Sequence, residues 1–170
     1  MFHLQSKRLR FRNYTNADFY FLKGLLQSKD MMRYIGDGQT RNDAEVEQFL
    51  SWIYTHYRED EQTGLKIIEN RKTGEPIGHA GIVPQIVNGQ MQFEIGYWVA
   101  KAYWGQGFAT EAAETMKAYA EQEMQLTQLI ALIQPGNFVS MRIAETIGMH
   151  LDKTEMLNGQ EVHVFVTNKP

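Results

Sequence analysis

The feature that most constrains the fold is a strand that runs through a glycine turn straight into a helix. Residues Met91 to Val99 alternate, with apolar side chains on one face and Gln92, Glu94, Gly96 and Trp98 on the other. This two-residue period is typical of a strand. The helix expected from Gly107 to Met124 has small residues on its inner face. The junction therefore predicts a helix packed closely on a sheet.

The other expected elements follow the same kind of pattern along the whole chain. Expected strands cover Leu4–Arg12, Leu65–Glu69, Pro76–Val87, Leu129–Ile133, Met149–Leu157 and Glu161–Thr167; expected helices follow the capping pair Thr15/Asp18, span Asp43–Tyr57 and run from Asn137 to Ile147. Two Asn-Gly pairs, at 88–89 and 158–159, predict hairpin turns. Residues 29–41 are expected to form a loop. Together they predict one mixed α/β domain over residues 1–170.

Composition excludes several classes of protein. The net charge of −3 argues against a nucleic-acid-binding protein, which needs a basic surface to neutralise phosphates. The chain has no cysteine, so disulfides, cysteine-based zinc sites and a cysteine acyl carrier are all ruled out. The five histidines have no metal-ligand spacing, and we expect no metal. No run approaches the roughly 18 apolar residues of a membrane span, and no signal peptide is recognisable, so a cytoplasmic location is expected.

The glycine turn itself, Trp104–Ala109, predicts an anion site. Gly105 and Gly107 let the main chain approach a ligand, and the following helix presents free N–H groups at its positive end. A glycine pair that merely turns the chain is the alternative. A dinucleotide fingerprint fits poorly because Thr110 stands where its third glycine belongs, and no P-loop motif is present. A nucleotide-binding module of another kind stays open.

Several segments of the chain resemble the GNAT acetyltransferases. The matching segments are Glu94-Ile95-Gly96-Tyr97-Trp98-Val99, Trp104-Gly105-Gln106-Gly107-Phe108-Ala109-Thr110-Glu111-Ala112, Asn137-x-x-Ser140 with Gly148-Met149, and the opening Lys7–Arg12. The similarity is greatest to the branch that includes the ribosomal-protein alanine N-acetyltransferases. It implies a mostly antiparallel sheet of seven strands with a splayed central parallel pair and about four helices.

The resemblance implies acetyl-CoA as co-substrate, lying in the gap between the strands that end near Val99 and Ile133. Its implied binding residues are Trp98, Val99, Trp104, Gly105, Gln106, Gly107, Phe108, Ala109, Thr110 and Asn137. Trp104 stands where the family usually has Gln or Arg, which removes one possible charged contact. Asn137 is read either as a contact to the pantetheine arm or as a plain helix cap.

Two residues are candidates for catalysis. Glu94 is the expected general base, acting directly or through water, although a solvated carboxylate or an anchor for the substrate ammonium fits as well. Many relatives protonate the leaving thiolate with a Tyr near the end of the last helix, but this chain has Thr146 and Ile147 there. Ser140 is the expected substitute. The alternatives are a Ser bonded to its own helix and a thiolate that leaves without an acid. A main-chain N–H near Val99 is implied as the oxyanion donor.

These observations predict an N-acetyltransferase that moves an acetyl group from acetyl-CoA directly to a primary amine. The acceptor is a protein N-terminus or a small-molecule amine, and the protein is a monomer or homodimer without nucleic-acid or membrane partners. Residues 29–41 and the hairpin tip at 157–160 are expected to shape the acceptor pocket. The alternative is a coenzyme A-binding sensor or scaffold without turnover.

Overall fold

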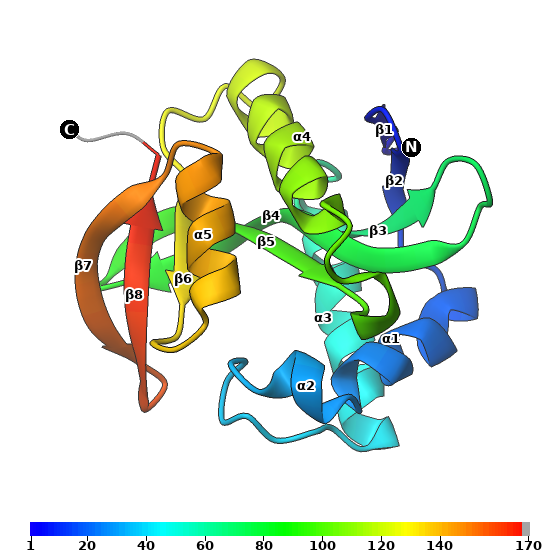
Figure 1. The fold of residues 1–170 in the computed structure, drawn as a ribbon, viewed down its shortest axis with the longest axis horizontal. Helices are drawn as coiled ribbons and strands as arrows, with labels where there is room; N and C mark the ends of the chain where they lie inside the picture. Colours follow the sequence, from blue (N-terminus) through cyan, green and yellow to red (C-terminus); the bar gives the residue numbers. More distant parts are fainter. Residues whose placement is uncertain (168–170) are drawn as a thin grey trace.

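The computed structural model describes residues 1–167, and within them eight strands form one sheet flanked by five helices (Figure 1). The strands are β1 Leu4–Gln5, β2 Leu9–Asn13, β3 Gly64–Asn70, β4 Pro76–Val87, β5 Gln90–Val99, β6 Ile130–Ile133, β7 His150–Leu157 and β8 Gln160–Val166. The helices are α1 Phe19–Leu26, α2 Lys29–Met32, α3 Asp43–Glu59, α4 Phe108–Gln122 and α5 Phe138–Thr146, with short 3₁₀ helices η1 Asn16–Asp18 and η2 Lys101–Tyr103. None of these helices is long and apolar enough to cross a membrane.

The mixed α/β fold is confirmed, while the number of elements differs from the expected seven strands and four helices. The expected strand Leu4–Arg12 is two strands, because the main-chain N–H of Ser6 donates to the Leu9 carbonyl and turns the chain back on itself. The expected loop 29–41 contains α2, which Ser28 caps by accepting a hydrogen bond from Met31. The turn between β1 and β2 covers only residues 6–8 and α2 has only four residues, so both are too short to show in a hydrophobic pattern.

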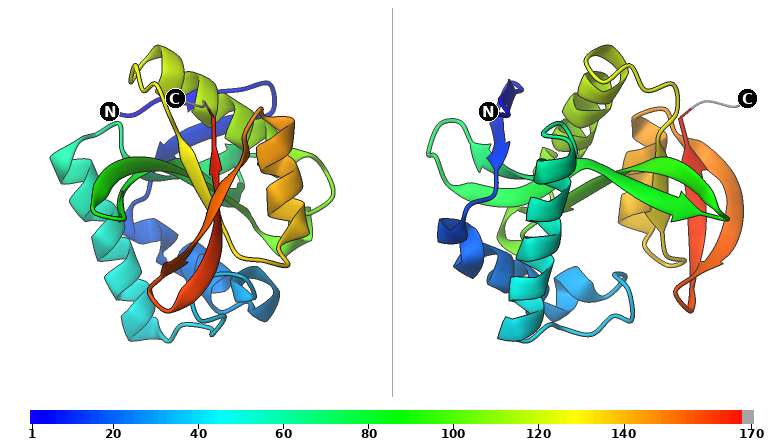
Figure 2. Two further views of the ribbon diagram at one scale, coloured as in Figure 1. Left: turned by 90° about the vertical axis from the view of Figure 1, so that its left-hand side faces the viewer. Right: turned by 180° about the vertical axis from the view of Figure 1, so that it is seen from behind.

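The sheet has the strand order β1-β2-β3-β4-β5-β6-β8-β7, and only β5 and β6 run parallel. Helices α4 and α5 cover one face, and α1 and α3 cover the other (Figures 1 and 2). Each layer has its own core: Met116 and Ala112 of α4 are fully buried on one side, and Ile53 of α3 is fully buried on the other. The fully buried Ala112 and Ala113 let α4 lie close to the sheet, as their size predicts.

The parallel pair is joined at one point only, between Glu94 of β5 and Ile130 of β6. Beyond it the two strands diverge toward their ends at Val99 and Ile133, so a gap opens in the middle of the sheet (Figure 1). The N–H of Ala100 donates to Ile77 in the neighbouring strand. Because hydrogen-bonding groups alternate along an antiparallel strand, the main-chain polar groups of Val99 point the other way, into this gap.

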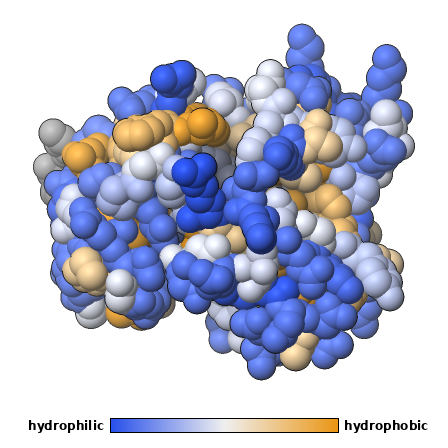
Figure 3. All heavy atoms as spheres, turned by 60° about the horizontal axis from the view of Figure 1, so that its bottom comes forward, coloured by the Kyte–Doolittle hydropathy of each residue, from blue (hydrophilic) through white to orange (hydrophobic). Residues whose placement is uncertain are grey.

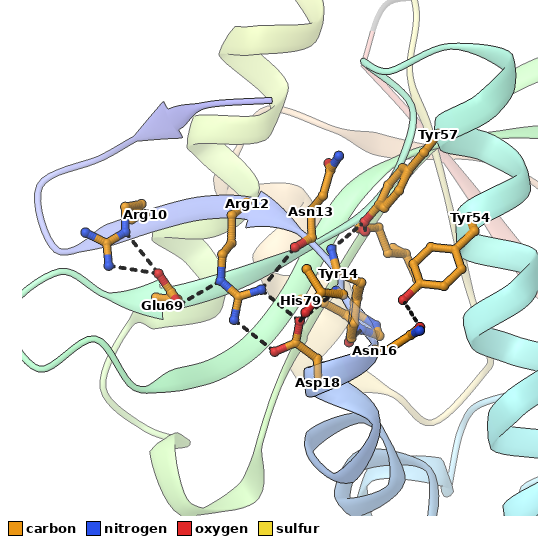
Figure 4. A network of polar contacts seen from close by, with 12 residues as sticks. Arg10, Arg12, Asn13, Tyr14, Asn16, Asp18, Tyr54, Tyr57, Glu69 and His79 are labelled. Atoms are coloured by element: carbon orange, nitrogen blue, oxygen red, sulfur yellow. Dashed lines mark hydrogen bonds and ion pairs between the residues drawn. The ribbon is translucent and has the colours of Figure 1, made fainter. Parts of the chain in front are cut away.

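A network of polar side chains joins β2, β3 and the start of α1 (Figure 4). Arg12 donates to both oxygens of Asp18 at 2.8 and 2.9 Å and to Glu69 at 2.7 Å. Next to it, the hydroxyl of Tyr14 lies 2.6 Å from Nδ1 of the fully buried His79. The network orients the segment that leads from the sheet into the helices over its second face.

Candidate active site

A cavity of about 580 Å³ lies where β5 and β6 diverge. Its wall is built from five parts of the chain: α2 with the loop after it, the second half of β5, the glycine turn with the start of α4, β6, and the start of α5. The cavity thus spans the gap in the sheet. The face seen in Figure 3, from the side of α1 and α2, is mostly hydrophilic and carries its hydrophobic residues in a few patches.

The glycine turn closes one end of the cavity with free main-chain donors. Gly105 and Gly107 have φ values of 77° and 79°, and Gly107 is the residue before the first turn of α4. No main-chain N–H from Gly105 to Thr110 donates to another residue of the described chain, and the first such bond is made by Glu111. Six adjacent donors at the positive end of a helix dipole fit a diphosphate.

Glu94 sits in the wall near the point where the strands part. Its Oε1 accepts a hydrogen bond of 2.9 Å from the Gln85 side chain, which comes from the neighbouring strand β4. Burial raises the pKa of Glu94 to about 7, although the hydrogen bond from Gln85 acts in the opposite direction. A carboxylate with a pKa near neutrality can exchange a proton with an amine under physiological conditions.

Ser140 lines the opposite side of the cavity, in the first turn of α5, and contacts Tyr97 of β5. The Tyr97 hydroxyl donates to the main-chain carbonyl of Ser140 at 2.9 Å, and the Ser140 hydroxyl lies 3.3 Å from the Tyr97 oxygen. Burial raises the pKa of Tyr97 to about 12. The hydroxyls of Tyr97 and Ser140 therefore meet at the cavity, and the Tyr97 hydroxyl is held in place by its hydrogen bond to the Ser140 main chain.

Trp104 occupies the position where the resemblance to the family implies Gln or Arg. Its indole Nε1 donates a hydrogen bond of 2.6 Å to the carbonyl of Val99, and 44% of the residue remains exposed. The Val99 carbonyl faces the gap between the strands, so the indole ties the glycine turn to the end of β5. Trp104 contributes shape to this end of the cavity and no charge.

The remaining expected binding residues lie where the sequence places them, with one exception. Trp98, Val99, Trp104, Gly105, Gly107, Phe108, Ala109, Thr110 and Asn137 all line the cavity. Gln106 does not, and its carbonyl instead accepts a hydrogen bond from Arg8. Asn137 acts as a helix cap by accepting from the Ser140 N–H at 3.3 Å. Whether these residues hold a ligand stays a prediction.

The loop after α2 contacts the segment between β6 and α5, on the side of the cavity where α2 lies. The Gln134 side chain donates to the carbonyl of Gly36 at 2.7 Å, and the Tyr34 ring lies against Gly136. Residues 30, 31 and 33–35 line the cavity, as expected for the segment 29–41. No residue of the hairpin tip at 157–160 lines this cavity, and its contribution to an acceptor pocket stays a prediction. Among residues 1–167 no group of three or more side chains is placed to hold a metal ion.

Sequence reasoning missed two residues of this site. Alternation along β5 placed Tyr97 on the face opposite Glu94, and therefore away from the chemistry. Both side chains reach the cavity because the cavity passes through the sheet. Gln85 carried no signal of its own, since its role depends on its contact with Glu94 across the hairpin.

Comparisons with known proteins agree with this geometry. The family model described as "Acetyltransferase (GNAT) domain" matches residues 8–150. The chain is 38% identical to the uncharacterized protein YkkB of Bacillus subtilis, over 89% of this chain and 87% of the relative. It is 30% identical to the uncharacterized N-acetyltransferase YnaD of the same species, over 86% and 82%.

The fold is also similar to a solved structure that contains coenzyme A. That structure is RimL, a ribosomal L7/L12 alpha-N-protein acetyltransferase, with a TM-score of 0.78 and 15% identity over 97% of both chains. At this identity the likeness concerns the fold alone.

Proposed function

Because the chain belongs to the GNAT acetyltransferase family, we propose that it transfers an acetyl group from acetyl-CoA directly to a primary amine. The observation that carries the proposal is the row of six N–H groups from Gly105 to Thr110, which donate to no other residue among 1–167 and belong, except for Gln106, to residues that line one end of the cavity. Main-chain donors of this kind suit the diphosphate of coenzyme A. The thioester supplies the acetyl group, and the rest of the chemistry falls to the residues of this chain.

Glu94 is the proposed general base. An amine attacks only when it is neutral, so a proton must leave it on the way to the transition state. A carboxylate with a pKa of about 7 can accept that proton, directly or through one water, at the pH of a cell. The hydrogen bond from Gln85 favours its charged form and holds it in one orientation.

Val99 and Ser140 are proposed to act on the two other groups that change charge. The N–H of Val99 faces the gap and is suited to donate to the carbonyl oxygen as negative charge develops on it. The Ser140 hydroxyl is suited to give a proton to the departing sulfur. Tyr97 supports it, because its hydroxyl contacts both the hydroxyl and the carbonyl of Ser140.

The acceptor is proposed to be a primary amine on a protein N-terminus or on a small molecule. It would enter from the side of α2, where the loop after this helix lines the cavity and the ion pair between Lys101 and Asp30 lies at 2.6 Å. Similarity of fold to RimL supports an N-terminus, but one fold hosts many acceptors. A cytoplasmic location and a monomeric or homodimeric state remain predictions.

A thiol-release assay with acetyl-CoA tests the proposal across a panel of amines. The panel holds peptides that begin with Ala or Ser, spermidine, an aminoglycoside and free amino acids. Release that depends on one of these amines is the expected result. Binding of coenzyme A without release for any amine would favour the sensor or scaffold instead. Heat protection by ATP or NAD and none by acetyl-CoA would favour a nucleotide-binding module.

A further inference from the structure

Arg8, far away in the sequence, is bound to the glycine turn and to the start of α4. Its Nη1 donates to the carbonyl of Gln106 at 3.0 Å, and its guanidinium carbon lies 4.2 Å from the centre of the Phe108 ring. Its Nε donates to Glu111 at 2.6 Å. Its Nη2 lies 3.4 Å from the position that a Cβ atom on Gly107 would take. The guanidinium therefore touches the turn at three successive residues.

The contact between Arg8 and Glu111 matters because Glu111 places a negative charge in the first turn of α4. Burial tends to raise the pKa of Glu111, but hydrogen bonds from Ser6 and Arg8 outweigh it and hold the pKa below its ordinary value. The carboxylate is therefore charged at neutral pH. A charged carboxylate at a helix N-terminus is favourable in itself, yet it repels any anion that binds to the same helix end.

The charge of Arg8 opposes that repulsion. Two of its five N–H donors, those on Nε and Nη1, are used in the contacts with Glu111 and Gln106. Nη2 makes no hydrogen bond with another described residue and faces the Gly107 side of the turn. The cation thus lies between the fixed carboxylate and the row of free main-chain donors.

We propose that Arg8 is a positioning residue of the coenzyme A site, which holds the glycine turn and cancels the charge of Glu111 so that the turn can accept a diphosphate. The proposal rests on the proposed function, since it names the anion that the turn binds. It also explains how the site can lack a charged contact at the position of Trp104: the cation comes from the segment that precedes β2.

Binding of coenzyme A to the ligand-free protein, measured by calorimetry, tests this directly. The variants are Arg8→Gln, Arg8→Lys, Glu111→Gln and the double variant Arg8→Gln/Glu111→Gln, which keeps the net charge of the natural chain. The control is Arg10→Gln, which removes a neighbouring arginine with similar exposure (38% against 41%) and an ion pair to Glu69. S-acetylpantetheine, which lacks the diphosphate, serves as a second acyl donor in a kinetic assay.

Arg8→Gln is expected to raise the Kd of coenzyme A about tenfold, as an unbalanced charge at a helix end predicts. It should leave kcat/KM for S-acetylpantetheine nearly unchanged. The double variant should regain most of the affinity, and Arg8→Lys should stay near the natural chain. Arg10→Gln should bind as the natural chain does.

An unchanged Kd in Arg8→Gln overturns the proposal. So does a double variant that binds as weakly as Arg8→Gln, because a role in holding the turn alone would give that result. If Arg8→Gln does not fold, Glu111→Gln decides: with the carboxylate charge removed and Arg8 kept, coenzyme A should bind at least as tightly as to the natural chain, and weaker binding overturns the proposal. Failure of the natural chain to bind coenzyme A would instead refute the proposed function itself.

Discussion

The hydroxyl of Tyr97 donates to the carbonyl of Ser140 at 2.9 Å, and the Ser140 hydroxyl lies 3.3 Å from the same phenol oxygen. This contact connects β5 with α5 across the gap that the parallel strands leave open. It gives the proposed proton donor a fixed neighbour that the local sequence around Ser140 does not reveal. The site therefore depends on both sides of the gap being held at the right separation.

Replacing Tyr97 by Phe should lower kcat about tenfold, which is less than the roughly 10²–10⁴-fold of a complete acid–base contribution, and should change KM for acetyl-CoA little. The phenyl ring keeps the packing but no longer orients Ser140. Steady-state kinetics with the best amine measures this, and Ser140→Ala should lower kcat at least as much. Tyr54→Phe is the matched control, since that hydroxyl bonds Asn16 away from the cavity. A rise in KM without loss of kcat would contradict the assignment.

The pH profile should report the ionisation of Glu94. With a folded pKa of about 7, the base is active when deprotonated, so kcat/KM should rise with pH and level off above that value. Gln85→Met removes a hydrogen bond that favours the charged form. The rising limb should then move to higher pH by about one unit, since one unit corresponds to about 1.4 kcal/mol. Glu94→Gln should abolish the rising limb along with most of the rate. A rising limb that is the same in both variants as in the natural chain would refute the role of Glu94 as general base.

Gly107→Val should weaken coenzyme A binding. The residue has a φ of 79°, which a branched side chain resists, so relief of the strain must turn the neighbouring N–H groups. Gly74→Val is the control, because Gly74 has a φ of 77° and open space around it and does not line the cavity. Thermal unfolding should register a similar cost for both variants, while calorimetry should register weaker binding only for Gly107→Val. Equal binding by the two would contradict the site.

Trp104 should report ligand binding through its fluorescence. The indole is 44% exposed at the cavity wall and bonds the Val99 carbonyl, so a ligand in the gap changes its surroundings. Titration with coenzyme A should alter the emission, and Trp104→Phe should remove most of the change. Trp52→Phe serves as the control, because Trp52 is 39% exposed on α3 and does not line the cavity. Because Trp98 also lines the cavity, a signal that is unchanged in both Trp104→Phe and Trp98→Phe would place the ligand elsewhere.

His79 should make the fold less stable in mild acid. It is fully buried, and burial lowers its pKa to about 3, whereas an unfolded chain binds the proton near the ordinary value of about 6.5. The unfolded state therefore binds more protons as pH falls below about 6.5, and stability drops with it. Between about pH 6.5 and pH 5 the loss should approach about 2 kcal/mol.

Chemical denaturation at several pH values measures the effect of His79. His79→Phe keeps a ring next to Trp98 and Phe49 and should flatten the dependence on pH, whatever it does to stability at neutral pH. His3→Gln is the control, because His3 is exposed. The same slope in His79→Phe as in the natural chain would refute the prediction.

The sequence by itself determined the elements that depend on neighbouring residues. The Asn-Gly pairs at 88–89 and 158–159 form hairpins, as their tolerance of positive φ predicts. Thr15 and Asp18 form the expected capping box, and the alanines of α4 lie against the sheet. The glycine turn before α4 could be recognised from the sequence as well. The free N–H groups at the start of a helix follow from the local main-chain geometry and do not depend on residues far away in the sequence.

Only the tertiary structure decided which side chains meet. Gln85 and Glu94, Tyr97 and Ser140, and Arg8 and Glu111 are 9, 43 and 103 residues apart, and each pair touches across different elements. The hydrophobic period of a strand or helix indicates which face a residue occupies, but it does not indicate which side chains of other elements lie opposite that residue. Tyr97 illustrates this limit: alternation put it on the face away from Glu94, and the divergence of β5 from β6 brought both to one cavity.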